Sequence, residues 1–531
     1  MKIIMQMHCE RFSKYKKLMI IQVVFGSLLY LVLIANQLTN THDGLWHGNY
    51  SLAKRWELSI GRWFWLYIDR LRLGISAEPT TSILTLIIIS IGNLYIIDIF
   101  DMIENKLSYL VCMLILSSTT VCNWLSYRYM SPVFASSYIL SIFAAWVLIK
   151  KVTGKNKKVE LLWCGLAAFA IALCLGAYQA NLACTCVLIL LYIFLSILRT
   201  QNVGCKILYI FYHLSVSFAS VGLGCLLYKG IWDIHMKIKN VSASSYNGAN
   251  NLSIKDMIFS IPKNIWKTYL VTYEYFFELN IKHNIFQQYG IYCIALVLFL
   301  AIVLLFFTKV KKIRKSLILL CIIILLLPMA CNISLFLATK SEIQIQMTGG
   351  MIILFPCLLC VFFLCYRLLC TGGVAVKIHM SLTLLISVAM LYGNIYMVTI
   401  DIDAMYEGKN ATETMLRNVV IQLQSMDSYS LDKKYLFIGV PSENATFRTT
   451  ALWNKANSYA RYGKFWMKTD CMRYSYNGVL RNMGILLPYN TDAAYNKLIK
   501  LQEIKDMPVY PSKGYIQEVE GCIVIKISDT Y

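Results

Sequence analysis

Charged residues are scarce in this sequence. Asp, Glu, Lys and Arg together make up 15% of its 531 residues, whereas 58% are hydrophobic. Soluble globular domains carry about 25% charged residues, so this composition excludes an ordinary soluble protein of this length. The composition indicates a chain whose main solvent is lipid.

Metal-ligand spacing is also lacking. The seven histidines are scattered and form no His-x-x-x-His pair, and most of the 18 cysteines lie within apolar runs. Buried cysteine packs as a small hydrophobe, so we expect neither a metal site nor a disulfide scaffold. Only Cys471 and Cys522 share the polar C-terminal tail, where a disulfide stays open as an alternative.

Long apolar runs are abundant. Runs of about 18 or more apolar residues can cross a hydrocarbon core as helices, because lipid offers backbone groups no other partner. We read the first run as a retained helix rather than a removed signal peptide. The sequence predicts about eleven transmembrane helices, at residues 18–36, 82–103, 107–122, 134–150, 161–178, 182–199, 207–228, 288–308, 316–338, 346–370 and 378–400.

Lysine and arginine clusters predict the orientation. Positive residues near helix ends are retained in the cytoplasm, and eleven spans place three basic clusters on one side. They are Arg11, Lys14, Lys16 and Lys17; Lys150, Lys151, Lys155, Lys157 and Lys158; and Lys309, Lys311, Lys312, Arg314 and Lys315. The N-terminus is therefore predicted to be cytoplasmic and the C-terminal tail extracytoplasmic. Residues that set the membrane orientation and contact anionic lipids explain the net charge of +22. The charge therefore does not require a nucleic-acid partner.

The first outer loop, residues 37–81, is unusually basic for an outer face. Its cations alternate with aromatic residues such as Trp56, Trp63 and Trp65, which is typical of amphipathic helices lying in the membrane interface. An anion site is the alternative. Guanidinium groups match phosphate oxygens in two-point contacts, which makes Arg55 and Arg62 candidate substrate-binding residues.

Two carboxylates in the same loop are candidate catalytic residues. Asp43 follows the first span closely, and Glu57 lies within the basic stretch. A carboxylate at the membrane surface could act as a general base. The alternatives are a solvated Asp43 and an ion pair of Glu57 with Lys54, Arg55 or Arg62.

Two further predicted outer turns contain polar groups. Tyr127 and Arg128 lie in the turn 123–133, where they form either an aromatic belt with a snorkelling arginine or one wall of a sugar-phosphate site. Tyr178, Gln179 and Asn181 lie at the turn after the fifth span. Such groups either hold helices together or bind sugar hydroxyls.

Asp98, Asp101 and Glu104 end the second predicted span on the opposite face. They favour either a solvated helix end or a proton-coupled transporter. A transporter or flippase is the main alternative to an enzyme, although neither an inverted repeat nor paired broken helices are apparent. A glycan polymerase is a further alternative.

From residue 401 onward the composition becomes that of a soluble domain. Residues 403–424 have helical periodicity through Met405, Leu416, Val420 and Leu423, and residues 435–440 and 522–527 resemble buried strands. The sequence predicts a membrane domain at 1–400 and a small α/β domain at 401–531, in an otherwise all-α polytopic protein.

Several short stretches carry a family resemblance. They are the position of Asp43 after the first span, the sequence Ser59-Ile60-Gly61-Arg62-Trp63, the sequence Tyr178-Gln179-Ala180-Asn181, and the polar tail. With these features the chain resembles the Gtr-type, GtrII-like serotype-converting glucosyltransferases of bacteria, whose multi-span architecture is often called GT-C. Many relatives carry two adjacent acids in the first loop, whereas here Asp43 is followed by Gly44. Asp43 is therefore alone unless Glu57 folds back toward it.

The resemblance implies a hexosyltransferase. Its donor would be a polyprenyl-phosphate-linked hexose, with glucose the expected sugar, and its acceptor a cell-envelope glycan on the outer face. The first-loop acid would be the general base, and the tail would recognise the acceptor. A small flippase and a cytoplasmic-face donor synthase are the expected partners. No cofactor is expected, because Arg62 or Arg128 could stabilise the leaving phosphate, although a divalent cation beside Asp43 stays open.

Overall fold

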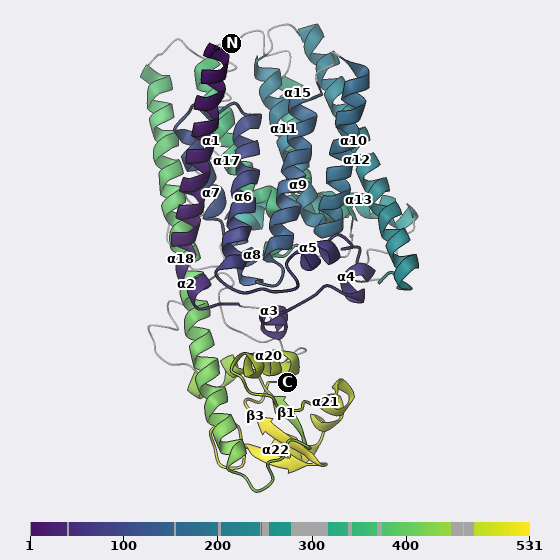
Figure 1. Cartoon of the computed structure of the whole chain (residues 1–531), viewed down its shortest axis with the longest axis vertical. Coiled ribbons are helices and arrows are strands. Elements are labelled where there is room, and N and C mark those ends of the chain that lie inside the picture. The colour runs from purple at the N-terminus through teal and green to yellow at the C-terminus, as the bar shows by residue number, and fades with distance from the viewer. Residues whose placement is uncertain are drawn as a thin grey trace.

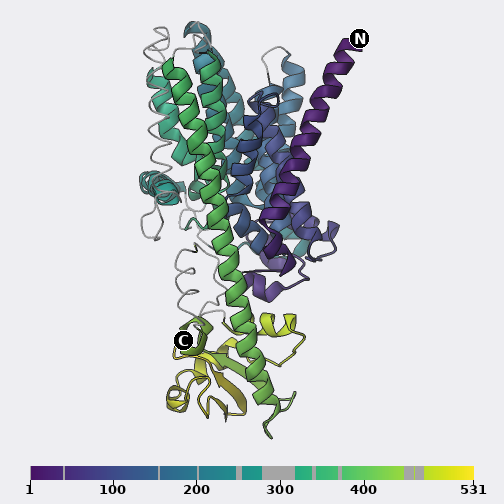
Figure 2. The same cartoon turned by 90° about the vertical axis from the view of Figure 1, so that its left-hand side faces the viewer.

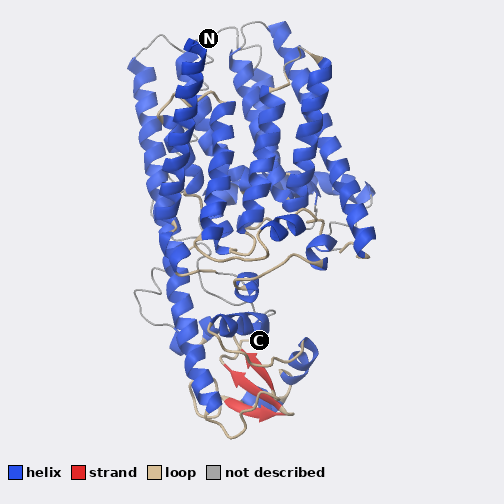
Figure 3. Ribbon diagram, in the orientation of Figure 1, coloured by secondary structure: helices blue, strands red, loops and turns tan. Residues whose placement is uncertain are grey.

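The protein is a bundle of long helices with a small α/β domain at one end (Figures 1 and 3). This computed structural model describes residues 2–39, 42–152, 156–199, 203–244, 246, 254–277, 317–337, 342–368, 374–447, 460 and 472–530. We call the end of the bundle that faces the α/β domain the domain end.

Seven helices in the described ranges are long and apolar enough to cross a membrane. They are α6 (Thr80–Ile99), α9 (Ser131–Lys150), α10 (Lys157–Ala177), α11 (Leu182–Arg199), α12 (Val203–Lys239), α17 (Gly349–Leu368) and α18 (Val374–Gln424). The pair α7 (Leu107–Leu116) and α8 (Thr119–Ser126) bends by 47° and gives an eighth span if counted as one. The chain is therefore a multi-pass membrane protein with seven or eight candidate spans in its described part.

The predicted count of eleven spans is not confirmed. The run 18–36 is divided between α1 (Lys2–Leu29) and α2 (Leu31–Ala35), and lysines occupy part of α1, so neither helix alone offers a full apolar span. The run 316–338 contains α15 (Leu317–Cys331), which at 15 residues is short, followed by α16 (Ser334–Leu337). The run 288–308 lies outside the described residues. Each of the other predicted ranges overlaps one of the candidate spans.

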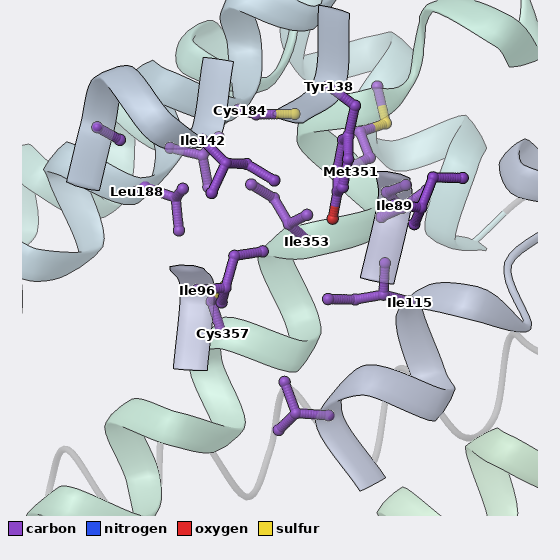
Figure 4. Packing of buried hydrophobic residues seen from close by; sticks show 14 of the residues in the cluster. Ile89, Ile96, Ile115, Tyr138, Ile142, Cys184, Leu188, Met351, Ile353 and Cys357 are labelled. Atoms are coloured by element: carbon purple, nitrogen blue, oxygen red, sulfur yellow. The ribbon is translucent and has the colours of Figure 1, made fainter. Parts of the chain in front are cut away.

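The bundle core is formed where apolar stripes of several helices meet. Figure 4 shows Ile89 and Ile96 of α6 in one packed cluster with Tyr138 of α9, Cys184 of α11 and Cys357 of α17. Ile89 and Ile96 lie two helical turns apart, as expected for one buried stripe. The cysteines do pack as small hydrophobes, and Cys112, Cys174, Cys184 and Cys357 are buried free thiols.

Polar contacts also join helices within the bundle. Asn93 of α6 donates to Gln22 of α1 over 2.9 Å and accepts from the Tyr138 hydroxyl over 2.8 Å. Such interhelical hydrogen bonds contribute about 0.6 kcal/mol each in lipid. They fix which faces of α1, α6 and α9 meet.

The described residues of the first two basic clusters lie at the same end of the bundle, away from the α/β domain (Figure 1). There Lys14 pairs with Glu104, and Lys150 pairs with Asp101 over 2.8 Å. Asp98 accepts hydrogen bonds from Tyr15 and, over 2.8 Å, from the Trp146 indole. These acids therefore serve helix-end contacts. The third basic cluster lies outside the described residues.

Three short helices form the first loop at the domain end: α3 (His42–His47), α4 (Arg55–Ser59) and α5 (Trp65–Leu71). The next long connection, after α12, leads to α13 (Ile254–Phe277), an amphipathic helix with Pro262 inside it. Single turns of 3-10 helix, η1 (Gln179–Asn181) and η4 (Ile345–Met347), begin α11 and precede α17.

A three-stranded sheet forms the centre of the C-terminal domain (Figure 3). Its order is β1 (Lys434–Ile438), β3 (Cys522–Lys526) and β2 (Ile516–Val519), with β1 parallel and β2 antiparallel to β3. The surrounding helices are α20 (Met472–Asn482), α21 (Asp492–Leu498) and α22 (Gln502–Asp506), and η5 (Pro441–Glu443) and η6 (Ala445–Phe447) follow β1. The predicted strands and the α/β character are confirmed.

The sulfur of Cys522 lies at the start of β3. It is a free thiol that donates to the Lys434 carbonyl oxygen over 3.3 Å and accepts from the Asn490 amide over 3.3 Å. The other cysteine considered for a disulfide, Cys471, lies outside the described residues. Cys522 is thus engaged as a thiol in the sheet.

Helix α18 joins the two parts of the protein. It runs for 51 residues from the bundle into the C-terminal domain and crosses the predicted boundary at residue 400 without a break (Figure 2). Met405 packs in the bundle core, whereas Leu416 and Leu423 pack in the core of the C-terminal domain. The predicted helix 403–424 is therefore the second half of one long helix.

Candidate functional site

The first loop is closed on itself near its two ends. Ser51 donates its backbone N–H to the Gly74 carbonyl oxygen, and Ser76 donates to that of Asn49, both over 2.8 Å. Gly74 has a φ of +71°, a conformation that favours glycine. The loop between these closing bonds can therefore present α4 and α5 as a compact unit.

A buried ion pair holds this unit together. The Asp69 carboxylate accepts from Arg72 over 2.7 and 3.0 Å and from the Ala53 backbone over 2.7 Å. Arg72 also donates to the Tyr129 carbonyl oxygen, which ties the loop to the turn before α9. Burial raises the pKa of Asp69, and the Arg72 charge opposes that rise.

The other side of the loop packs on the ends of α10 and α12. Phe64 donates its N–H to the Gly176 carbonyl oxygen over 2.8 Å, and the Trp232 indole donates to that of Leu58 over 2.6 Å. Gly61, at φ +85°, leaves room for Tyr228, whose hydroxyl would lie 2.1 Å from a Cβ there. The close approach that glycine permits at residue 61 is thus made by the Tyr228 and Gln179 side chains.

Gln179 completes this contact. Its side-chain amide donates to the Ile60 carbonyl oxygen over 3.0 Å and contacts the Tyr228 hydroxyl over 3.2 Å. The predicted resemblance stretches around Gly61 and Gln179 therefore meet, although they lie far apart in the sequence.

The Arg62 side chain lies beside two aromatic rings. Its Cζ lies 5.0 Å from the centroid of the Tyr178 ring and 5.8 Å from that of Trp65. Its Nε is buried and has no hydrogen-bond partner within the described part of the chain. A guanidinium held between aromatic faces with a spare donor is suited to bind an anion.

The two rings beside this guanidinium belong to a chain of five aromatic residues in contact with one another, which we call the aromatic cluster: Trp65, Tyr129, Tyr127, Phe134 and Tyr178. Tyr129 lies between Trp65, at 6.0 Å, and Tyr127, at 6.3 Å between ring centroids. Phe134 meets Tyr178 edge-on at 4.8 Å. The cluster brings together residues from the first loop, the turn after α8, and the ends of α9 and α10.

Asp43 lies close to the aromatic cluster. It is half-buried in the first turn of α3, and burial followed by the Asp43 charge are the leading reasons why the pKa of Tyr129 is raised. At the other end of α3, the His47 ring packs on Tyr129 at 4.2 Å. The Arg62 charge acts on Tyr129 in the opposite sense. A carboxylate, a cation and phenol groups are thus gathered around Tyr129.

Glu57 has a local partner. Its carboxylate accepts the Lys54 backbone N–H over 2.6 Å at the start of α4. Its charge adds a smaller contribution to the raised pKa of Tyr129. Arg55 is the first residue of α4 and is exposed.

Arg128 has hydrogen-bond partners of its own. It is 4% exposed and donates to the side-chain oxygens of Gln37 and Asn49 over 2.9 and 2.8 Å. Burial lowers the pKa of Arg128, and the Glu78 charge opposes this. Arg128 therefore joins α2 and the first loop to the start of α9.

Asn181 is fully buried beneath the cluster. Its amide donates to the Phe134 carbonyl oxygen over 3.2 Å, and its Oδ1 has no hydrogen-bond partner among the described residues. That oxygen would lie 2.3 Å from a Cβ on Gly349 at the start of α17. Asn181 thus supports helix contacts and keeps one unused acceptor.

The structure adds residues that sequence reasoning did not single out. Tyr129 is the meeting point of the cluster, and Asp69 holds the loop, but neither was named as a site residue. Helical spacing could have indicated His47, because it follows Asp43 by four residues. In the described ranges, no three His, Cys, Asp or Glu residues gather as a metal site.

Comparison with known proteins identifies a family for the central part of the chain. Residues 49–357, more than half of the chain, match the protein family described as Glucosyl transferase GtrII. No curated protein and no solved structure matches. The matched segment contains Glu57, Arg62, the aromatic cluster and Gln179, whereas Asp43 precedes it. This multi-pass membrane protein belongs to the Glucosyl transferase GtrII family.

Proposed function

We propose that the protein transfers glucose from a polyprenyl-phosphate donor to a cell-envelope glycan at the domain end of the bundle, which faces out of the cell. The observation that carries the proposal is Arg62, which lies between Tyr178 and Trp65 with a buried, unpartnered Nε. A phosphate that leaves a sugar gains negative charge, and a preorganised guanidinium stabilises that charge.

Asp43 supplies the second requirement of the reaction. The acceptor hydroxyl must lose its proton as its oxygen bonds to the anomeric carbon and the bond to phosphate breaks. A half-buried carboxylate beside the aromatic cluster is suited to receive that proton. Glu57 is less suited, since one of its oxygens already caps α4.

The remaining predicted site residues divide into two groups. Tyr127 and Tyr178 offer ring faces and edges for the sugar in the aromatic cluster. Gln179, Arg128 and Asn181 act by holding the loop and the helix ends in place. Arg55, which is exposed, is suited to contact lipid or acceptor at the rim.

The test uses membranes containing the full-length protein and radiolabelled polyprenyl-phosphate glucose. We expect transfer of label to envelope glycan by the wild type, a loss of about 100-fold or more in Asp43→Asn, and a smaller loss in Glu57→Gln. Unchanged transfer in Asp43→Asn would remove Asp43 as the base. Movement of intact donor across the membrane without transfer would instead support a flippase.

A further inference from the structure

We infer that the C-terminal domain positions the Asp43 helix, so that Leu45, Trp46 and Gly478 act as positioning residues for sugar transfer. The inference rests on the proposed role of Asp43 as the base. Helix α3 has only six residues, and helices this short do not persist in water without tertiary contacts. The conformation of α3 must therefore come from the surfaces on which it packs.

One of these surfaces is the core of the C-terminal domain. Leu45 is 1% exposed and belongs to the same buried cluster as Val479 and Leu480 of α20 and Phe437 of β1. A residue of the first loop thus completes the apolar core of a domain formed by the other end of the chain. Figure 1 shows α3 lying directly against α20.

Gly478 makes the close packing of the two helices feasible. A Cβ at this position would lie 2.0 Å from the Leu45 carbonyl oxygen, 2.4 Å from its carbonyl carbon and 2.9 Å from the Trp46 Cα. These are backbone atoms, which cannot rotate away as a flexible side chain can. Any side chain at residue 478 must therefore push α3 and α20 apart.

Trp46 attaches α3 to the domain a second time. The Arg481 guanidinium lies over its ring, 5.1 Å from the centroid, and donates to the Trp46 carbonyl oxygen. Tyr474 and Tyr489 approach the same indole edge-on at 5.3 and 6.1 Å. The domain therefore contacts both the backbone and the side chain of Trp46 in α3.

The opposite side of α3 is bound to the membrane part of the site. The His47 ring packs on Tyr129 at 4.2 Å, and His47 Nδ1 is hydrogen-bonded to the Ser51 hydroxyl over 3.0 Å. Helix α3 lies between the C-terminal domain and the aromatic cluster, with Asp43 one helical turn before His47. Displacement of the domain would move the carboxylate relative to Arg62.

The experiment compares Gly478→Ala with Gly165→Ala in the full-length protein. Both glycines are helical, but a Cβ at residue 165 meets nothing within 4 Å. Alanine favours helix over glycine, so a loss in Gly478→Ala cannot arise from weaker helix formation. Trp46→Ala is a second variant, which removes one attachment without adding a clash.

Two quantities are measured for each variant. Hydrogen exchange of the peptide covering residues 42–48 reports whether α3 stays docked, and glucose transfer gives kcat and the KM for the donor. We expect faster exchange in Gly478→Ala, a fall in kcat of about 100-fold and a donor KM within about twofold, because a misplaced base slows chemistry more than binding. Gly165→Ala should match the wild type in both measurements.

A double variant separates positioning from general damage. If Gly478 acts through Asp43, Gly478→Ala should lower kcat little further in an Asp43→Asn background. Three results would each overturn the inference. They are faster exchange of α3 with a wild-type kcat, fully additive losses of kcat in the double variant, and unchanged exchange in both Gly478→Ala and Trp46→Ala. Absence of transfer in the wild type would refute the proposed function, while the exchange data would still show whether the domain holds α3.

Discussion

Leu45 of the first loop and Gly478 of the C-terminal domain are in backbone contact, although more than four hundred residues separate them in the sequence. The contact places the helix of Asp43 between the soluble domain and the aromatic cluster at the membrane. It gives the C-terminal domain a structural part in the candidate site.

Arg62 provides the sharpest test of donor recognition. Arg62→Lys keeps the charge but loses the planar fork that lies between Tyr178 and Trp65, and we expect kcat/KM to fall about tenfold to 100-fold. The measurement is transfer of labelled glucose in membranes at matched protein levels. Arg70→Lys, at an exposed position of α5, is the control, and equal losses in the two variants would contradict this role for Arg62.

Asp69 should matter for stability. Asp69→Asn leaves the buried Arg72 charge unpaired, and we expect the unfolding free energy to fall by about 3 kcal/mol. Thermal melting in detergent measures the loss. The matched variant Arg70→Met should change stability by less than about 1 kcal/mol, because that arginine is exposed. A melting curve of Asp69→Asn that overlays the wild type would disprove the prediction.

Gly439 should be intolerant of a side chain. It has φ +93°, and a Cβ there would lie 2.2 Å from the Ser528 backbone nitrogen, so Gly439→Ala should destabilise the C-terminal domain by about 3 kcal/mol or more. Gly521 also has a positive φ, +72°, but a Cβ there meets nothing within 4 Å. Gly521→Ala should therefore cost only about 1 kcal/mol. Thermal proteolysis of the two variants compares backbone strain alone, in Gly521→Ala, with strain plus a steric collision, in Gly439→Ala.

Alkylation of Cys522 should depend on pH in a defined direction. Burial raises the pKa of the Cys522 thiol, so the folded protein holds less thiolate at pH 8 than an ordinary thiol would. Labelling by N-ethylmaleimide, followed peptide by peptide, should be slow at pH 8 and rise at higher pH. In detergent-denatured protein, labelling at pH 8 should be fast, and equal rates in the two states would contradict the buried assignment.

Local sequence patterns predicted the helices and strands better than the contacts between them. The long apolar runs located most spans, and short continuous apolar runs located β1 and β3, because burial of one element leaves a trace in its local sequence. The break at Tyr30, which divides the first run between α1 and α2, leaves no such trace. At residue 401 the surroundings change from bundle to domain while the helix continues, so a change in composition was read as a boundary.

The candidate site was predictable only residue by residue. Arg62 and Tyr178 could be chosen as polar or aromatic groups at predicted turns, but their contact depends on the folding of α5 against the end of α10. Tyr129 and His47 meet through the same long-range packing. The burial of Leu45 in a distant core has no local signature, since one leucine in a polar loop is common.

Because α18 is unbroken, its length fixes how the C-terminal domain is rotated relative to the membrane helices. An α-helix advances 1.5 Å and turns about 100° per residue, so 51 residues form a rod roughly 75 Å long. Inserting two residues between Met405 and Met415 would rotate the C-terminal domain by about 200°, turning α20 away from α3, whereas four residues would rotate it by a net 40° or so. The length of this helix, counted in whole turns, therefore decides which face of the domain meets the membrane.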